Sequence, residues 1–346
     1  MTNNETVLVL GAGASAPFGY PLGSALIENI VRGLDSIPDD FYPNFSNTLH
    51  SFDFLNSPYT AIVNYAWSQG TTPIPSEFIQ SVKPWKTLGV ELHHTSHQSI
   101  DEFARTNPRL NKVVKLLIAL EIARVGFDKS SIKNNRLLVT PRLTANARAN
   151  WHGKLVAHLR RAHRSAEEFR NSSPLTIVTF NYDHSLEDFL EKELHRAELY
   201  ADLKIDEAVN IIHVHGVLKM TQSPSPTTPL AIHFGKCLMA AAEDFLVIDD
   251  KRNHKRDHQD PATFAKHLLE QAGHIVTIGF DFHPPNVDLI GLNKPKIAPK
   301  IRALNYSGSA AFDGRAFRAG LTSDMIMKDG KNFEISTAID EGLFEF

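Results

Sequence analysis

TVLVLGAGAS, residues Thr6–Ser15, is a short apolar run that stops at a glycine-rich turn. The run Val7–Leu10 predicts a buried strand, because short Val and Leu runs bounded by turn residues are typical of parallel sheets. The turn matches the G-x-G-x-x-G/A fingerprint, whose glycines allow a tight turn and bring backbone amides close to a phosphate. Pro17, Gly19 and Pro21 follow, so the loop is expected to continue to about Gly23 before a helix starts. A glycine turn without any ligand is the alternative.

Four further apolar runs predict strands. They are Leu175–Phe180, Ala208–Val214, Ile275–Ile278 and Ile301–Leu304. Apolar residues at helical spacing occur between and around these runs, at Ser24–Leu34, Ser185–Glu193 and Pro261–Ala272. The alternation of strands and helices predicts an α/β fold with a Rossmann-like parallel sheet.

A mostly helical insertion is expected within this sheet domain. We predict a discontinuous Rossmann domain over residues 1–35 and 171–320, an insertion over 36–170 and a C-terminal tail over 321–346. The insertion is interpreted as a lid or an oligomerisation region. Its apolar helix, Lys112–Val125, suits a subunit interface. A lid that buries its own core is the alternative.

Composition excludes several classes of protein. The 346 residues are 42% hydrophobic and 22% charged with a net charge of -3, so no basic field favours nucleic acid or an anionic membrane. Cys237 is the only cysteine, which excludes an intrachain disulfide and a paired-cysteine zinc site. The start of the chain, Met1–Thr6, is polar, and no window of about 18 apolar residues occurs. We therefore expect neither a signal peptide nor a membrane span, and a cytoplasmic protein.

Polar residues follow each predicted strand. Besides Gly11, Ala12, Gly13 and Ser15 they include Asn181, Asp183, His213, His215, Gly279, Asp281 and Asn305. Ligands of open parallel sheets bind outside the carboxyl ends of the strands, so these residues together predict one site. Asn and Asp often merely end a strand by turning the chain, which remains the alternative for each position taken alone.

Two histidines alternate along the third predicted strand. His213 and His215 are two residues apart, so we expect them to face the same side. They could ligate a metal or be buried structural residues. No metal is expected, because a zinc site normally needs three or four protein ligands and no further ligand is evident here. The motif His93-His94-x-x-His97 is interpreted as a solvated face.

The motifs resemble those of sirtuins. Gly11–Ser15 followed by Gly19-Tyr20-Pro21 looks like the sirtuin GAGxS…GxP loop. Thr179–Asp183 resembles the TxNxD motif, and His215-Gly216 resembles the HG motif that carries the sirtuin histidine. The later glycine motif corresponds to Gly279–Asp281, and Asn305 to the asparagine under the adenosine ribose. The order along the chain also agrees.

Two departures narrow the resemblance. A sirtuin deacetylase has DFR where this chain has Leu22-Gly23-Ser24, and it has a four-cysteine zinc ribbon that one cysteine cannot supply. The chain instead resembles the zinc-free, sirtuin-like NAD hydrolases of bacterial anti-phage defence. That family implies NAD+ as substrate and assembly into homo-oligomers, alone or with a partner protein such as an ATPase.

The resemblance implies an NAD+ glycohydrolase that releases nicotinamide and ADP-ribose. Asn181 would orient the ribose and a water, His215 would accept a proton, and Asp183 would support Asn181. The residues implied to bind the nucleotide are Gly11, Ala12, Gly13, Ser15, Gly279, Asp281 and Asn305. A module that senses NAD or ADP-ribose without cleaving it is the alternative, followed by an NAD-dependent deacylase or ADP-ribosyltransferase.

Overall fold

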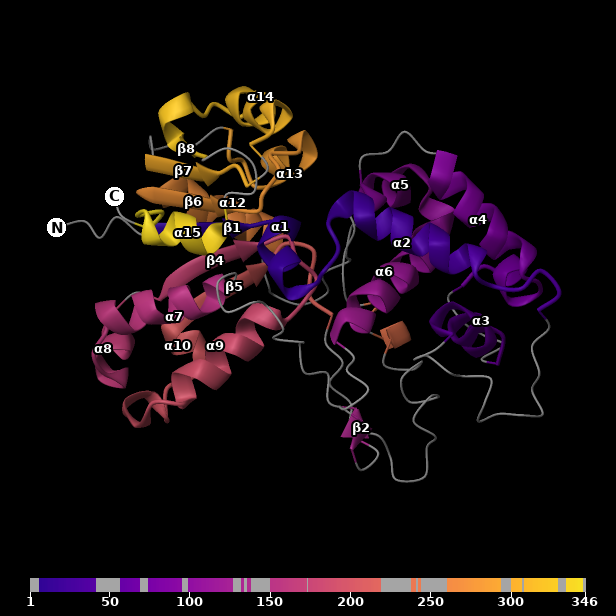
Figure 1. Cartoon of the computed structure of the whole chain (residues 1–346), viewed down its shortest axis with the longest axis horizontal. Helices are drawn as coiled ribbons and strands as arrows, with labels where there is room; N and C mark the ends of the chain where they lie inside the picture. Colours follow the sequence, from indigo (N-terminus) through magenta and orange to yellow (C-terminus); the bar gives the residue numbers. More distant parts are fainter. Residues whose placement is uncertain are drawn as a thin grey trace. The chain divides into compact units, whose positions relative to one another are not determined.

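Six parallel strands form one sheet in the described part of the chain (Figure 1). They are β1 (Thr6–Leu10), β4 (Leu175–Thr179), β5 (Val209–His213), β6 (His274–Ile278), β7 (Lys300–Leu304) and β8 (Ile326–Met327). Their spatial order is β5-β4-β1-β6-β7-β8. Counted by appearance in the chain, this is 3-2-1-4-5-6, the strand order of the Rossmann fold. The predicted α/β class with a Rossmann-like parallel sheet is confirmed.

The computed structural model describes most of the chain, in several segments. These are residues 6–41, 57–68, 74–94, 99–126, 132–133, 136–137, 150–172, 174–218, 238–240, 242–243, 260–293, 300–306, 308–328 and 334–344. Cys237 and His97 lie outside them.

Two units make up the chain. The sheet unit comprises Met1–Tyr20, Leu143–Gly216 and Arg252–Phe346, and the helical unit comprises Pro21–Arg142 and Val217–Lys251. These boundaries differ from the expected ones, because contacts between segments distant in sequence decide to which unit a helix belongs. α2 (Gly23–Asp35) packs on α4 (Lys83–His94) of the helical unit, whereas α7 (Trp151–Ala162) packs on α9 (Ser185–His195) of the sheet unit. The expected tail is part of the sheet unit, since β8 pairs with β7 and α15 (Ile335–Asp340) packs on α7.

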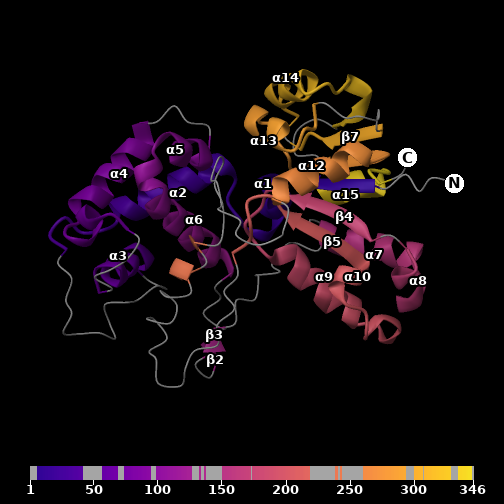
Figure 2. The ribbon, with the colours of Figure 1, turned by 180° about the vertical axis from the view of Figure 1, so that it is seen from behind.

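Helices cover both faces of the sheet. α7 and α15 lie against one face and α12 lies against the other, as the two opposite views show (Figure 1 and Figure 2). α12 spans Pro261–Gln271. The other helices in the described residues of this unit are α1 (Ala12–Ser15), η1 (Ala16–Phe18), α8 (Ala166–Arg170), η5 (Glu198–Tyr200), α10 (Ile205–Ala208), α13 (Pro284–Leu289), α14 (Ala310–Arg318) and η6 (Ser323–Met325).

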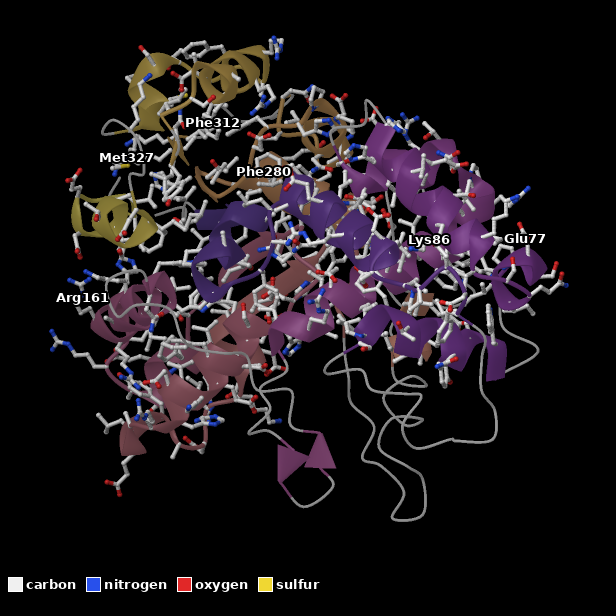
Figure 3. All side chains as sticks on the ribbon, turned by 45° about the vertical axis from the view of Figure 1, so that its right-hand side comes forward. Glu77, Lys86, Arg161, Phe280, Phe312 and Met327 are labelled. Atoms are coloured by element: carbon white, nitrogen blue, oxygen red, sulfur yellow. The ribbon has the colours of Figure 1, made fainter. Side chains whose placement is uncertain are left out.

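The core on the α12 side follows from strand alternation. Val9 of β1 and Val178 of β4 point to this side and pack in one buried cluster with Leu269 of α12. Phe280 and Phe312, both labelled in Figure 3, belong to the same cluster. Each such side chain stabilises the fold by about 1.5–3 kcal/mol through burial.

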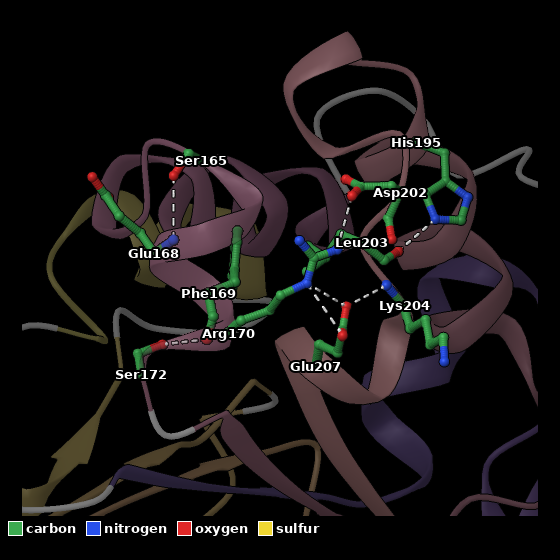
Figure 4. Close-up of polar contacts among 10 residues, drawn as sticks. All are labelled: Ser165, Glu168, Phe169, Arg170, Ser172, His195, Asp202, Leu203, Lys204 and Glu207. Atoms are coloured by element: carbon green, nitrogen blue, oxygen red, sulfur yellow. Dashed lines mark hydrogen bonds and ion pairs between the residues drawn. The ribbon is translucent and has the colours of Figure 1, made fainter.

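Arg170 links α8 to the segment that precedes β5 (Figure 4). Its guanidinium donates to Glu207 over 3.2 Å and to the carbonyl and carboxylate oxygens of Asp202 over 3.0 and 3.1 Å. The Glu207 carboxylate also accepts from the Lys204 amide over 2.9 Å at the start of α10. These exposed contacts are screened by solvent, so they orient the chain entering β5 more than they stabilise it.

The helical unit is built around one buried helix. Its elements are α2, α3 (Pro58–Ser68), η2 (Ser76–Ile79), α4, α5 (Ile100–Thr106), η3 (Pro108–Leu110), α6 (Asn111–Gly126), β2 (Ile132–Lys133) and β3 (Arg136–Leu137). In α6 each residue of Leu116–Leu120 is at most 1% exposed, so the helix is apolar and buried on all sides. Its acidic residue, Glu121, accepts from the Tyr59 hydroxyl over 2.8 Å and pairs with Arg124. The helix expected to offer an apolar interface is therefore a core helix.

The segment Gly11–Phe18 after β1 contains α1 and η1, so the prediction of a loop up to about Gly23 is wrong; Pro17 is tolerated because it lies in the first turn of η1. This segment (the loop after β1) touches the loop after β6 through backbone atoms. The Gly11 amide donates to the Ile278 carbonyl over 3.0 Å, and the Gly13 amide donates to the Gly279 carbonyl over 3.1 Å. A Cβ on Gly13 would lie 2.7 Å from the Gly279 Cα, and one on Gly279 would lie 2.1 Å from the Ala14 nitrogen. Gly279 also has φ of 61°, which disfavours any side chain. Only glycine allows this contact.

Replacing Gly279 with alanine should destabilise the protein by more than about 2 kcal/mol, because strain at positive φ adds to the clash. Gly314→Ala is the matched control, since a Cβ in this part of α14 meets nothing within 4 Å. That control should gain about 0.5–1 kcal/mol, as glycine disfavours helix interiors. Denaturant unfolding measures both variants, and wild-type stability of Gly279→Ala would contradict the close contact.

Candidate functional site

A buried polar network joins the loop after β1 to the loop after β4. The Asn181 Nδ2 donates to the Ser15 Oγ over 2.8 Å. The Ser15 hydroxyl also hydrogen-bonds to the Asp183 carboxylate, and because a carboxylate only accepts, the hydroxyl is the donor. All three residues are at most 9% exposed. The structure thus brings together three residues that the sequence predicts as one site.

Asp183 is held by the first turn of α9. Its carboxylate accepts from the Ser185 amide over 3.1 Å and from the Ser185 hydroxyl. Burial raises the pKa of Asp183, and the hydrogen bonds from Ser185 and Ser15 offset part of that rise. The carboxylate is therefore fixed in position beside Asn181.

A small cavity lies beside this network. Leu10, Thr179 and His213 line it, and they are register partners across the ends of β1, β4 and β5. Ser15, Asn181 and Asp183 also line it, together with Trp151, His152 and Glu187. Its volume of about 10 Å³ has room for about one water molecule.

Trp151 anchors α7 to the loop after β1. Its Nε1 donates to the Ala14 carbonyl over 2.8 Å. Trp151 is the first residue of α7. The Asn150 side chain caps the helix by accepting from the Gly153 amide. Trp151 was not among the predicted site residues. The signal in the sequence was a helix cap, Asn150, followed directly by two aromatic residues, Trp151 and His152.

His152, the second residue of α7, is 1% exposed. Its ring stacks on Phe18 with centroids 3.9 Å apart and an interplanar angle of 18°. Burial lowers the pKa of His152 to about 3, so the ring is neutral at physiological pH. Its Nδ1 has no hydrogen-bond partner among the described residues, a defect that typically costs about 1–3 kcal/mol.

His213 forms a half-buried pair with Glu187. Its Nδ1 lies 3.0 Å from the Asn181 carbonyl oxygen and its Nε2 lies 2.5 Å from the Glu187 Oε1. Both partners are acceptor oxygens, so each ring nitrogen contacts an acceptor. Burial raises the pKa of Glu187, but the hydrogen bond and charge of His213 outweigh it, so the pKa is lowered. Glu187 was not among the predicted site residues.

His215 has different surroundings from His213. Strand β5 ends at His213, and the Gly216 amide donates to the His213 carbonyl over 3.0 Å to close a turn. The His215 ring lies 5.4 Å from the Phe180 ring and 6.0 Å from the Tyr182 ring. The buried His215 does not line the cavity. The expected shared face fails because strand alternation stops where the turn begins.

The other predicted nucleotide-binding residues lie outside the cavity. Ala12 is exposed at the start of α1. The Asp281 side chain is 65% exposed and pairs with Arg315. Asn305 is fully buried and donates to Asp313 over 2.8 Å, where it helps close the turn between β7 and α14.

The backbone amides of the glycine-rich turn were expected to lie close to a phosphate. Those of Gly11 and Gly13 donate to the carbonyls of Ile278 and Gly279, so both are already used within the protein. The glycines serve the backbone contact between two loops. The sequence fingerprint does not distinguish this role from phosphate binding, because both require a residue without a side chain.

No protein-family model and no curated protein matches this chain. Among the described residues no group of three His, Cys, Asp or Glu side chains is placed to hold a metal. No helix in those same segments is long and apolar enough to cross a membrane.

The carboxyls of Asp183 and Glu187 should change stability in opposite directions with pH. The folded-state pKa of Asp183 is raised, so the native state binds its proton first, and wild type should gain stability relative to Asp183→Asn as pH falls from neutral toward 4. The pKa of Glu187 is lowered, so wild type should lose stability relative to Glu187→Gln as pH falls below about 5. Denaturant unfolding across pH 3.5–7.5 measures both differences. The same sign for both would contradict the assigned environments.

Proposed function

We propose that this chain is a cytoplasmic NAD+ glycohydrolase that cleaves NAD+ to nicotinamide and ADP-ribose. The observation that carries the proposal is the buried network of Ser15, Asn181 and Asp183 at the carboxyl edge of the sheet. Ligands of Rossmann-like sheets bind outside this edge, near the point where the strand order reverses. That point lies between β1 and β6, and the network lies at the same edge of the sheet, on the β4 side of β1. The same three residues carry the resemblance to sirtuin-like NAD hydrolases.

The proposed reaction breaks the bond between nicotinamide and ribose C1′ through an oxocarbenium-like transition state. Water attacks C1′ as the C1′–N bond breaks, and the bonding electrons leave with neutral nicotinamide. Asn181 orients the ribose and the water, and His215 accepts the proton that the water loses. Histidine suits this role because its unperturbed pKa of about 6.5 is near the working pH. His213 suits it less, because both of its ring nitrogens contact acceptors.

The electrostatics of the site support a reaction that develops positive charge. Burial raises the pKa of Tyr20 first, and the nearby carboxylates of Asp183, Asp188 and Glu187 raise it further. A negative field that disfavours a phenolate favours a cationic ribosyl group. The field comes from fixed side chains, so it needs no rearrangement during the reaction.

The second candidate is a module that binds NAD or ADP-ribose without cleaving it. It is favoured by the position of His215, which packs against Phe180 and Tyr182 and does not line the cavity beside Asn181. Mixing the pure protein with NAD+ and measuring free nicotinamide and ADP-ribose separates the two candidates. Cleavage supports the hydrolase, and binding without products supports the sensor.

Asn181→Ala and His215→Ala should each abolish NAD+ cleavage while the protein remains folded. Loss of a general base usually slows a reaction about 10²–10⁴-fold. His267→Ala is the control, because His267 is an exposed residue of α12 outside the site and should keep wild-type turnover. Nicotinamide release and thermal unfolding are measured for all variants. Near-normal turnover by folded His215→Ala would remove its assigned role.

The resemblance extends the proposal to an abortive-infection effector of anti-phage defence that acts as a homo-oligomer or with a partner protein such as an ATPase. An enzyme that is always active would deplete its own cell of NAD+. Most soluble assemblies are symmetric homo-oligomers, so we expect this chain to form one as its concentration rises. Turnover per chain should therefore increase with protein concentration. Molecular mass in solution and NAD+ turnover are measured together across protein concentration. A monomer with full activity per chain would contradict this regulation.

A further inference from the structure

His152 is a buried polar residue that the mechanism above does not use. It lies at the start of α7, which Trp151 fastens to the loop after β1 through the Ala14 carbonyl. The ring is enclosed by aromatic neighbours. Phe18 stacks on it at 3.9 Å, and the rings of Trp151 and Phe189 lie 4.5 and 5.5 Å away.

A phenyl ring would satisfy all of these contacts. Stacked and edge-on aromatic pairs need only the ring faces and edges, not a ring nitrogen. A phenylalanine here would also avoid burying a nitrogen without a partner. The aromatic packing therefore does not explain why this residue has ring nitrogens.

The unused nitrogen belongs to a residue that lines the cavity with Ser15, Asn181 and Asp183. The Nδ1 of His152 has no hydrogen-bond partner within the described segments. The cavity of about 10 Å³ accepts one water molecule or one hydroxyl group, but not a sugar ring. An unpaired buried polar atom of a cavity-lining residue is typically satisfied by a group that occupies the cavity.

We propose that His152 and Asp183 form a subsite for one sugar hydroxyl of the ligand. The identity of that ligand as a ribosyl nucleotide rests on the proposed function. A neutral imidazole has one donor and one acceptor nitrogen, and a carboxylate retains further acceptor positions beyond its bonds to Ser15 and Ser185. The hydroxyl thereby meets both a nitrogen and an oxygen partner. This contact places the sugar against Asn181.

His152→Phe tests the subsite, because it keeps the aromatic contacts and removes the nitrogens. It should melt at or above the wild-type temperature and bind ADP-ribose about 3- to 10-fold more weakly, the effect of one lost hydrogen bond. Removing one hydroxyl of the terminal ribose should weaken binding to wild type and leave binding to His152→Phe unchanged. Isothermal titration with ADP-ribose and its deoxy analogues measures both effects.

His163→Phe is a matched control in the same unit. His163 also stacks on a phenylalanine, Phe169, at 4.2 Å, but its nitrogens contact Leu159 and Ser172 over 3.2 and 3.0 Å. Its replacement should lower the melting temperature and leave ADP-ribose affinity unchanged. The two variants therefore separate a packing role from a ligand-binding role.

Two different results would overturn the subsite. If wild type binds ADP-ribose, and His152→Phe binds ADP-ribose and each deoxy analogue as tightly as wild type does, the subsite is wrong and the proposed function stands. If wild type neither binds ADP-ribose nor releases nicotinamide from NAD+, the proposed function fails and the subsite fails with it. Should His152→Phe not fold, His152→Leu takes its place with the same expected loss of affinity.

Discussion

The backbone contact between Gly13 and Gly279 is the constraint on which the site depends. It brings the loop after β1 to within hydrogen-bond distance of the loop after β6, at the point where the strand order reverses. No side chain fits between the two loops. The contact holds the loop after β1 on the side of β6. Ser15 lies on the side of β4, where its hydroxyl accepts a hydrogen bond from Asn181.

Two further contacts complete the support of that loop. The Trp151 indole binds the Ala14 carbonyl from α7, and the Asn181 amide binds the Ser15 hydroxyl from the end of β4. Each of these groups is buried, so leaving one unpaired would cost about 1–3 kcal/mol. Buried hydrogen bonds of this kind rigidify their surroundings. The loop is therefore preorganised before any ligand arrives.

Neighbouring carboxyls of the site have opposite environments. Asp183 is bound by neutral donors, and burial raises its pKa, whereas Glu187 is paired with His213 and its pKa is lowered. Pairs of titratable groups whose environments shift their pKa values apart are characteristic of sites with distinct acid and base roles. The neutral ring of His152 adds a third group that remains uncharged near pH 7.

The arrangement of strands was predictable to a large extent. The five predicted strands match β1, β4, β5, β6 and β7 closely, because apolar runs of this length are buried wherever they pack. β8 was not predicted, since two residues carry no periodic signal. The domain boundaries could not be read locally either, because the contacts that assign α2 and α7 join segments distant in sequence.

The sequence by itself determined the fold class and the grouping of Ser15, Asn181 and Asp183, because strand ends of a parallel sheet meet at one edge. Only the tertiary structure decided which neighbours complete the site. The cavity is also lined by Trp151, His152 and Glu187, which lie on helices. The spacing of apolar residues predicts a helix but not which of its turns contacts a loop distant in sequence. The same holds for His213 and His215, whose surroundings differ because the strand ends between them and the chain turns away.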